Sequence, residues 1–285
     1  MKVDAVGSWT QEKLELLRQY LQAYTSILNT QKWCKGCHYV DAFAGGVQHV
    51  DKESGELIDG SPLLALQNQP PFASFIFIDR DEERINTRIK PLQKQFPDAD
   101  IKPFVGDCNI ILAEQVIPRF QGGKSSPYRG FIFLDPYGID LAWETVQAIA
   151  KTQMHDVLIN FSVMGVYRQL AKNKLPTEAN LKKINRLMGT EDWFSVAYKP
   201  SPQYTLFDMG DNLERQSENL AKNLTNFYAQ RLKTVFSHVS RPVTMYNSNG
   251  GPLYALILAS HVQLAVTKMH EIFDRRKRSG RLRPD

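Results

Sequence analysis

The chain has 285 residues, of which 42% are hydrophobic and 23% are charged, an ordinary composition for a soluble globular protein. Its three cysteines are too few for a disulfide framework, and its longest apolar stretch, residues 252–266, is too short and too polar to span a membrane. Because the first residues include an acid and no apolar run of the signal-peptide kind, we expect a cytoplasmic protein.

Basic charge is concentrated at the C-terminal end of the sequence. The net charge is +5, and residues 274–285 carry six basic and two acidic side chains, which leaves 29 basic and 28 acidic residues elsewhere. A basic segment can contact nucleic-acid phosphates, although a solvated chain end has the same composition. We therefore divide the chain into a domain, residues 1–273, and a basic tail, residues 274–285.

The first predicted element is an amphipathic helix over residues 8–29, with a capping box formed by Ser8 and Gln11. After a first strand, the polar residues 46–60 predict a loop. A short helix then begins at Ser61-Pro62, since proline suits the first helical turn.

Strands and helices alternate along the next part of the chain. Apolar runs rich in Phe, Ile and Val are typical of strands that are buried on both faces of a parallel sheet. Two of the predicted strands end at Asp41 and Asp135, and the other three cover residues 74–78, 101–105 and 156–161. The predicted helices between these strands cover residues 81–95, 109–120 and 141–151.

The alternation stops after residue 162. Residues 163–235 contain no clear strand and include a long helical pattern, so we interpret them as a helical insertion beside the cleft. A hairpin with strands 239–246 and 253–259 follows, and then a last helix over 263–273. Repeated β/α units before a terminal hairpin indicate an α/β fold, a class I methyltransferase-like (Rossmann-like) seven-stranded sheet with strand order 3-2-1-4-5-7-6.

Four of the apolar runs end in an aspartate, at Asp41, Asp79, Asp107 and Asp135. In open parallel sheets the carboxyl ends of the strands line the crevice that binds ligands. We therefore expect the four carboxylates to face one cleft.

The turn after the first strand suits a nucleoside cofactor. Asp41, Phe43, Gly45 and Gly46 form a small-residue turn that lets a ligand approach the backbone, but they do not form the G-x-G-x-x-G motif of dinucleotide sites. This favours S-adenosylmethionine, although short glycine turns are also common in loops. Asp79 is placed to accept hydrogen bonds from the ribose hydroxyls, and Asp107 is placed to accept one from the adenine amine. Each aspartate could equally be a loop residue or a helix cap.

Asp135-Pro136-Tyr137-Gly138 is the most specific local motif. A carboxylate beside a backbone carbonyl can accept both hydrogens of a substrate NH₂, which directs the nitrogen lone pair toward a methyl donor. Tyr137 can stack on a flat base. The motif resembles the D/N-P-P-Y signature of amino-methyltransferases, and more closely the Asp-Pro-Phe-Gly of tRNA guanosine-N2 dimethyltransferases. The alternative is a turn in which Asp135 caps a helix.

Cys34-Lys35-Gly36-Cys37-His38 matches the C-x-x-C-H pattern of haem attachment and offers three metal-type ligands. Haem attachment of this type requires export, and a structural zinc needs a fourth ligand. His38 also leads directly into the first strand. We therefore predict no metal site here.

Taken together and in order, these motifs resemble those of the three-Cys-motif partner (TcmP) proteins over nearly the whole chain. The resemblance implies a methyltransferase-like protein encoded beside a partner that carries a three-cysteine, radical-enzyme-like motif. One position departs from the family pattern D-x-F-A-G-x-G, because Val47 replaces the second glycine and Gly46 comes one place early. The motifs that carry the resemblance are Tyr39–Gly45, Gly60–Leu66, Phe77–Asp79, Gly106–Asn109, Phe133–Gly138, Asp156–Phe161 and Leu253–Leu256.

Two functions remain open from the sequence. The first is an S-adenosylmethionine-dependent enzyme that methylates an exocyclic amine of a base in RNA or DNA, with Asp135, Pro136 and Tyr137 at the target and the basic tail on phosphates. The second is a non-catalytic scaffold that binds a three-Cys-motif protein through the insertion. The intact Asp-Pro-Tyr-Gly motif favours the first, whereas Val47 and the nearly neutral body favour the second.

Overall fold

The apolar runs of the sequence form the parallel part of a mixed sheet, as strands covered on both faces require. A computed structural model of the chain describes residues 4–120, 122–172, 175–200, 213–216 and 219–282. The parallel strands are β2 (Gly36–Asp41), β5 (Ser74–Asp79), β6 (Ile101–Val105), β7 (Tyr128–Leu134) and β8 (His155–Phe161).

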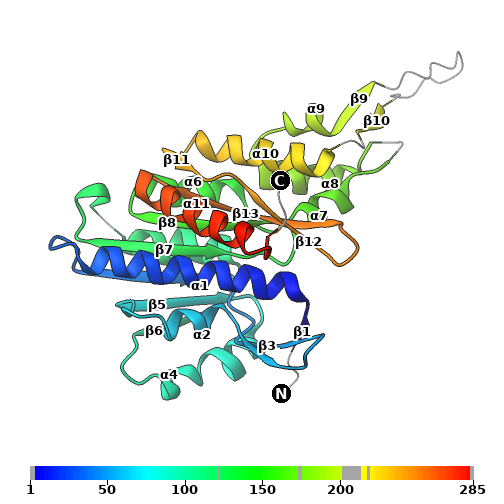
Figure 1. Cartoon of the computed structure of the whole chain (residues 1–285). Helices are drawn as coiled ribbons and strands as arrows, with labels where there is room; N and C mark the ends of the chain where they lie inside the picture. The colour runs from blue at the N-terminus through cyan, green and yellow to red at the C-terminus, as the bar shows by residue number, and fades with distance from the viewer. Residues whose placement is uncertain (1–3, 121, 173–174, 201–212, 217–218, 283–285) are drawn as a thin grey trace, which may run out of the picture.

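Antiparallel strands complete one side of this sheet (Figure 1). β13 (Pro252–Ser260) pairs with β8, and both β11 (His238–Val239) and β12 (Val243–Tyr246) pair with β13. The strands lie in the order β11-β13-β8-β7-β2-β5-β6, with β12 also beside β13. The sheet has eight strands where the sequence predicts seven, because the edge strand expected over 239–246 is divided into β11 and β12.

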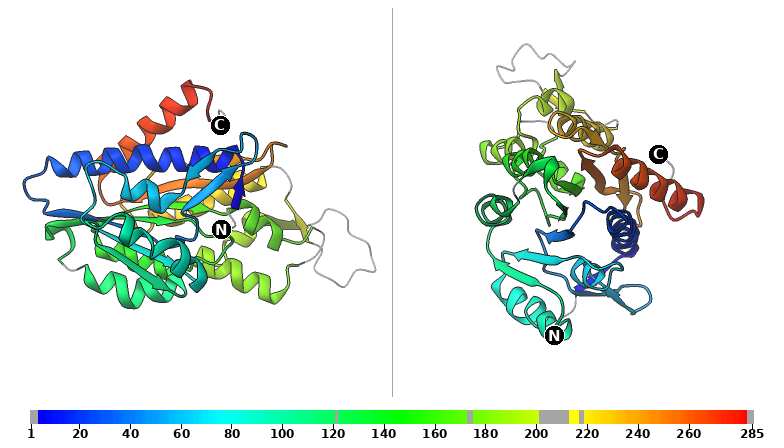
Figure 2. Two further views of the ribbon diagram at one scale, coloured as in Figure 1. Left: turned by 90° about the horizontal axis from the view of Figure 1, so that it is seen from below. Right: turned by 90° about the vertical axis from the view of Figure 1, so that its left-hand side faces the viewer.

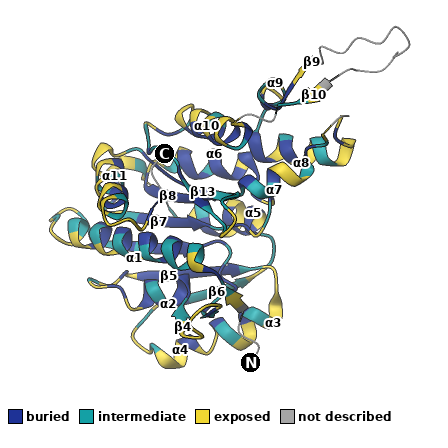
Figure 3. Cartoon of the chain, turned by 45° about the vertical axis from the view of Figure 1, so that its right-hand side comes forward, coloured by how far each residue is buried: buried dark blue, intermediate teal, exposed yellow. Residues whose placement is uncertain are grey.

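Helices cover both faces of the sheet (Figure 2), and its central strands are largely buried, whereas the edge strand β6 is only partly buried (Figure 3). One hydrophobic core lies under α1 (Ser8–Asn29), α2 (Ser61–Leu66) and α11 (Gln263–Arg278), together with the helical segments Glu82–Arg84 (α3), Ile85–Ile89 and Leu92–Gln95 (α4). The other lies under α6 (Trp143–Thr152), the insertion helices and the helical segments Cys108–Ile111 (α5), Leu112–Val116 and Ile117–Arg119.

Two expectations near the N-terminus are wrong. The predicted loop 46–60 contains β3 (Gln48–Asp51) and β4 (Leu57–Asp59), which form a small sheet with β1 (Asp4–Val6). The capping box of α1 does not form, because Gly7 is the N-cap and the Gln11 side chain instead donates to Asp51, 2.8 Å away. Gln11 thus ties α1 to the small sheet.

The insertion is largely helical but not free of strands. It contains α7 (Val163–Gln169), α8 (Glu178–Met188), α9 (Trp193–Ala197) and α10 (Leu220–Lys233), and β9 (Tyr198–Pro200) pairs antiparallel with β10 (Leu213–Arg215). Residues 173–174, 201–212 and 217–218 of the predicted insertion lie outside the described part of the chain. Because the Tyr228 ring of α10 stacks on Phe161 of β8 at 4.6 Å, the insertion shares a core with the sheet.

The predicted basic tail is in large part structured. α11 continues past Phe273 to Arg278, and Leu282 is 4% exposed. The Arg276 guanidinium forms a two-pronged ion pair with Glu12 of α1. The predicted end of the last helix at residue 273 is therefore wrong, whereas the division of the chain at that residue stays a prediction, and Arg283 lies outside the described residues.

Candidate active site at the carboxyl edge of the sheet

The structure brings three of the predicted aspartates to one edge of the sheet. Asp41 and Asp79 are the last residues of the parallel neighbours β2 and β5, and Asp135 directly follows β7, the other neighbour of β2. Asp107 comes just after β6 and is the N-cap of α5. The strand ends thus place these carboxylates along a common edge of the sheet, and that they face one ligand cleft stays a prediction.

Asp41 is the most deeply buried of these carboxylates, with no exposed surface. It accepts hydrogen bonds from the Phe43 backbone N–H at 3.2 Å and from the Tyr39 hydroxyl at 3.4 Å. Burial raises the pKa of Asp41 to about 7, although a hydrogen bond from Ser61 and the one from Phe43 act in the opposite direction. Strongly shifted carboxyl pKa values of this kind are common at functional sites.

The glycine turn packs directly on Asp79. A Cβ atom at Gly45 would collide with the Asp79 carboxylate and with the side chain of Arg84, and one at Gly46 would collide with the His49 ring. The carbonyl of Gly45 accepts a hydrogen bond from Arg88 at 3.2 Å. Glycine at position 45 is therefore required for this backbone to approach Asp79 so closely.

Val47, the departure from the family pattern, does not protrude from this turn. Its side chain is 6% exposed and belongs to the core under α1 and α2. Its carbonyl accepts a hydrogen bond from Gly60 N–H at 2.8 Å. The substitution is accommodated by the core, and Gly45 and Gly46 still form the turn.

Asp107 is the helix cap that the sequence offered as the alternative to an adenine-binding role, and it also pairs with Arg80. One carboxylate oxygen caps α5 by accepting from the Asn109 backbone and side chain at 2.8 and 2.9 Å, and the other accepts from Arg80 at 2.9 Å. Partial burial acts to raise the pKa of Asp107, but the Asn109 and Arg80 hydrogen bonds outweigh it, so the pKa is lowered. The Asp107 carboxylate is thus held in place at the carboxyl edge of the sheet.

Asp135 is held from both sides. Lys13 of α1 donates to Oδ2 at 2.6 Å, and Asn160 of β8 donates to Oδ1 at 2.6 Å. Pro136 is buried, whereas Tyr137 is fully exposed, at 104% of the reference area. A tyrosine in such a position has its whole ring available to a ligand.

Sequence reasoning did not find Lys13, Asn160 or Tyr254 as parts of this site. Lys13 lies 5.2 Å from the centroid of the Tyr254 ring, and burial together with the charge of Asp135 raises the pKa of Tyr254. Two signals were available. Lys13 lies on the buried face of α1, three and seven residues before Leu16 and Tyr20, and Asn160 interrupts an otherwise apolar run.

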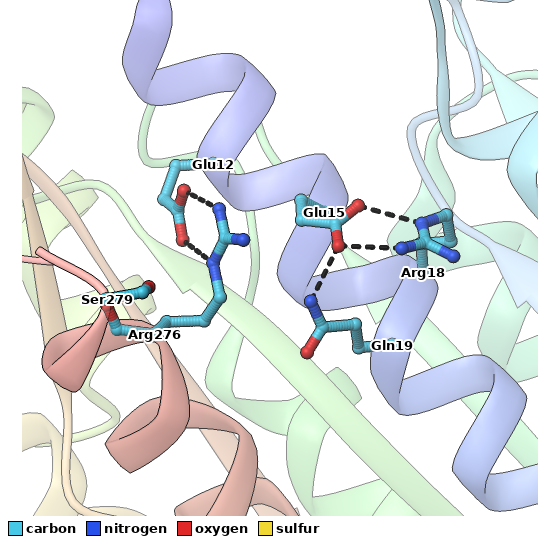
Figure 4. A network of polar contacts seen from close by, with 6 residues as sticks. All are labelled: Glu12, Glu15, Arg18, Gln19, Arg276 and Ser279. Atoms are coloured by element: carbon cyan, nitrogen blue, oxygen red, sulfur yellow. Dashed lines mark hydrogen bonds and ion pairs between the residues drawn. The ribbon is translucent and has the colours of Figure 1, made fainter. Parts of the chain in front are cut away.

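A cavity of about 740 Å³ lies next to α1, and none of the predicted site residues lines it. Its walls include the two charge networks of Figure 4. In one, Arg276 is bound to Glu12; in the other, Glu15 accepts from Arg18 at 2.7 Å and from Gln19 at 2.6 Å. Because none of the four predicted strand-end aspartates lines this cavity, we place the candidate site outside it, at Asp135.

The cysteine motif does not gather ligands. Cys37 is buried, and its burial raises the pKa of the thiol to about 12. His38 instead shares a hydrogen bond with Ser74 at 2.7 Å. Over the described ranges, no three His, Cys, Asp or Glu side chains are grouped as metal ligands. In the same ranges, no helix has the length and apolar character needed to cross a bilayer.

Neither a protein-family model nor a curated protein matches this sequence. Among solved structures, a Legionella pneumophila protein of the family DUF519 is similar with a TM-score of 0.54 and 10% identity, over 91% of this chain and 89% of that one. The O-methyltransferase TomG from Streptomyces achromogenes, in complex with SAM, has a TM-score of 0.41 and 12% identity, over 86% of this chain and 79% of that one. An O-methyltransferase from Bacillus cereus, in complex with SAH, has a TM-score of 0.40 and 10% identity, over 86% of this chain and 80% of that one. The likeness to the DUF519 protein shows a shared mixed α/β fold with a central multi-stranded sheet.

Proposed function

We propose that this chain is an S-adenosylmethionine-dependent methyltransferase that modifies an exocyclic amine of a nucleic-acid base. The single observation that carries this proposal is the geometry of Asp135. Its carboxylate follows β7, is fixed by Lys13 and Asn160, and stands beside the exposed ring of Tyr137.

The glycine turn and its acidic neighbours fit the proposed cofactor. The space where a Cβ of Gly45 would lie is filled by the Asp79 carboxylate and the Arg84 side chain, so a ligand at this turn would meet main chain, a carboxylate and a guanidinium. Asp79 would accept the ribose hydroxyls, Asp107 the adenine amine, and Asp41 and Phe43 would close the turn beneath the cofactor. When bound, S-adenosylmethionine supplies an electrophilic methyl group.

Asp135 retains the capacity to bind a substrate amine. An ionised carboxylate has about four lone-pair positions, and Lys13 and Asn160 use one on each oxygen. An amine N–H could therefore donate to Asp135 while a second N–H donates to a backbone carbonyl beside Pro136. The nitrogen lone pair would then form the new N–C bond as the methyl group leaves sulfur, and the nitrogen would give one proton to solvent.

Tyr137 provides a surface for the base that carries this amine. Stacking of a base on an exposed aromatic ring contributes about 1–3 kcal/mol and tolerates different bases. The exposed Arg275 and Arg278 at the end of α11 would contact phosphates, whereas Arg276 is bound to Glu12. These features favour RNA or DNA over a small amine.

The test is methyl transfer from labelled S-adenosylmethionine to total cellular RNA and DNA. Asp135→Ala should lower the rate at least about 100-fold, because the amine loses its positioning contact, while cofactor affinity stays unchanged. Equal labelling by both proteins would contradict the assignment of Asp135.

A non-catalytic scaffold that binds a three-Cys-motif protein is the second candidate. The observation that favours it is that both oxygens of Asp135 already have protein partners. If this candidate is right, neither RNA nor DNA is labelled, whether or not the three-Cys-motif protein is added. That protein should then copurify equally with the wild-type chain and with Asp135→Ala.

A further inference from the structure

A second cavity, of about 270 Å³, lies at the opposite edge of the sheet from Asp135. Asp156, at the start of β8, is one of its walls, whereas Asn160, near the end of the same strand, contacts Asp135. The volume is close to the lower end of ligand pockets, which hold about 300–1,000 Å³. The cavity is lined by Tyr20, Ala23, Tyr24, Ile27, Leu28, Gln31, Trp33, Arg129, Asp156, Val262, Leu264, Ala265 and Lys268.

Most of this lining is aromatic or aliphatic, and a carboxylate lies among it. Asp156 is 9% exposed and accepts from the Tyr20 hydroxyl at 2.8 Å and from the Ser260 hydroxyl at 2.5 Å. Two donors leave lone pairs of the carboxylate available to a further N–H or O–H. Burial raises the pKa of Asp156 to about 6, so the carboxylate is mostly ionised at neutral pH.

The mouth of the cavity is apolar and partly rigid. Trp33, Val262 and Leu264 are 45%, 52% and 46% exposed. The Arg129 guanidinium lies 4.4 Å from the centroid of the Trp33 ring and donates to the carbonyls of residues 124, 126 and 128. Tryptophan and arginine in such settings are the residues that dominate binding energy at protein interfaces.

Basic residues adjoin the lining of this mouth along the chain. Lys32 adjoins the lining residues Gln31 and Trp33, and Lys124 supplies one of the carbonyls that hold Arg129; both lysines are exposed. Lys35 is also exposed and is anchored through its backbone N–H to the carbonyl of Pro127 at 2.7 Å. An occupant with acidic residues around its anchoring group would complement this rim.

We propose that this cavity docks an acidic segment of a partner protein, which inserts a tryptophan or tyrosine side chain toward Asp156. The ring would fill the apolar walls, its N–H or O–H would donate to the carboxylate, and flanking carboxylates would face the lysines. Aliphatic walls disfavour a nucleobase, whose polar edges would be left unpaired against them. Docking here would leave the edge that carries Asp135 open.

The experiment uses a fluorescein-labelled peptide with a central tryptophan flanked by two glutamates on each side, titrated with the full chain by fluorescence anisotropy. We expect saturable binding that Leu264→Glu weakens about tenfold or more, because it places a charge in the apolar mouth and repels the peptide. Leu57→Glu is the matched control, since Leu57 is 63% exposed on β4 and does not line this cavity. The Lys32→Glu/Lys35→Glu variant should weaken binding and reduce its salt dependence, whereas Lys182→Glu on α8 should not.

Changes in the probe test the polar contact without disturbing the fold. A tyrosine peptide should bind more tightly than its phenylalanine counterpart to wild type, and the difference should disappear in Asp156→Asn if that variant unfolds at the wild-type temperature. The proposal is overturned if the peptide does not saturate up to millimolar protein, or if Leu264→Glu binds it like wild type. It is also overturned if a lysine-flanked peptide, free indole or a poly(A) oligonucleotide binds the cavity as tightly as the acidic peptide.

Discussion

Lys13 in the first helix and Asp135 after the fourth parallel strand along the chain, β7, form an ion pair of 2.6 Å across 122 residues of sequence. Both side chains are largely shielded, with 10% and 22% of their surfaces exposed. Because Asn160 holds the other oxygen, the carboxylate has a fixed orientation before any substrate arrives. Preorganisation of this kind is what a positioning carboxylate requires.

Removing Lys13 should affect stability and activity together. We expect Lys13→Met to lower the free energy of unfolding by about 1–3 kcal/mol, because Asp135 loses a charged donor in a shielded site. Methyl transfer should fall, while the affinity for S-adenosylmethionine is retained. Urea unfolding of Lys13→Met, Asp135→Asn and the double variant measures the coupling, and strictly additive losses would show that the two side chains do not interact in solution.

Asp41 should make stability depend on pH in a defined direction. Its pKa is raised from 3.8 to about 7 in the folded chain, so the folded state binds more protons than the unfolded state between these values. The free energy of unfolding should therefore fall as the pH rises from about 4 to 7, by up to about 4 kcal/mol from this group.

Asp41→Asn should remove this part of the pH dependence. The buried Asp156 has a raised pKa of about 6 and contributes a slope of the same sign, but it is present in both proteins. The difference between wild type and variant, measured by urea unfolding from pH 4 to 8, isolates Asp41. If the free energy of unfolding depends on pH in the same way in wild type and variant, the raised pKa of Asp41 is contradicted.

The close approach of Gly45 to Asp79 predicts a cofactor-specific defect. In Gly45→Ala the new methyl group must displace the Asp79 carboxylate or Arg84, and we expect the Kd for S-adenosylmethionine to rise about tenfold or more. Gly138→Ala is the control, because a Cβ there meets no atom within 4 Å. Isothermal titration calorimetry with S-adenosylmethionine measures the Kd of both variants. Equal Kd values would show that Gly45 is not part of the cofactor site.

Tyr137 should matter for substrate and not for folding. Since its ring is fully exposed, Tyr137→Ala should change the free energy of unfolding by less than about 0.5 kcal/mol. The KM for the nucleic acid should rise about 5- to 100-fold as a stacking contact is lost, and Tyr137→Phe should keep the wild-type value. If the alanine variant has an unchanged KM, the base does not stack on this ring.

Arg276 should behave as a structural residue, unlike its neighbours in the basic segment. Arg276→Gln should lower the free energy of unfolding by about 1–2 kcal/mol, because Glu12 loses a two-pronged partner in a site where both side chains are less than one-fifth exposed. Arg278→Gln, at an exposed position of the same helix, should leave stability unchanged and weaken nucleic-acid binding. Thermal unfolding and a salt titration of RNA binding separate the two effects.

The places of the acidic residues at the strand ends follow from the amino-acid pattern alone. Apolar runs of strand length report burial on both faces, and parallel strands bring their carboxyl ends to one edge whatever the intervening helices contain. For that reason the sequence predicts that Asp41, Asp79 and Asp135 lie at the same edge of the sheet. The glycine turn followed from the same logic, since its small residues lie directly after the first of these strands.

The contacts that these residues make depend on the folded arrangement of the whole chain. The partners of Asp135 come from positions 13 and 160, and the partner of Arg276 comes from position 12, separations that no local pattern reports. The same applies to the backbone pairing that converts the predicted loop 46–60 into β3 and β4, because hydrogen bonds between strands depend on which segments meet. Periodicity describes how a segment folds locally, whereas the charge, pKa and orientation of a side chain are set by neighbours that the fold brings from elsewhere in the chain.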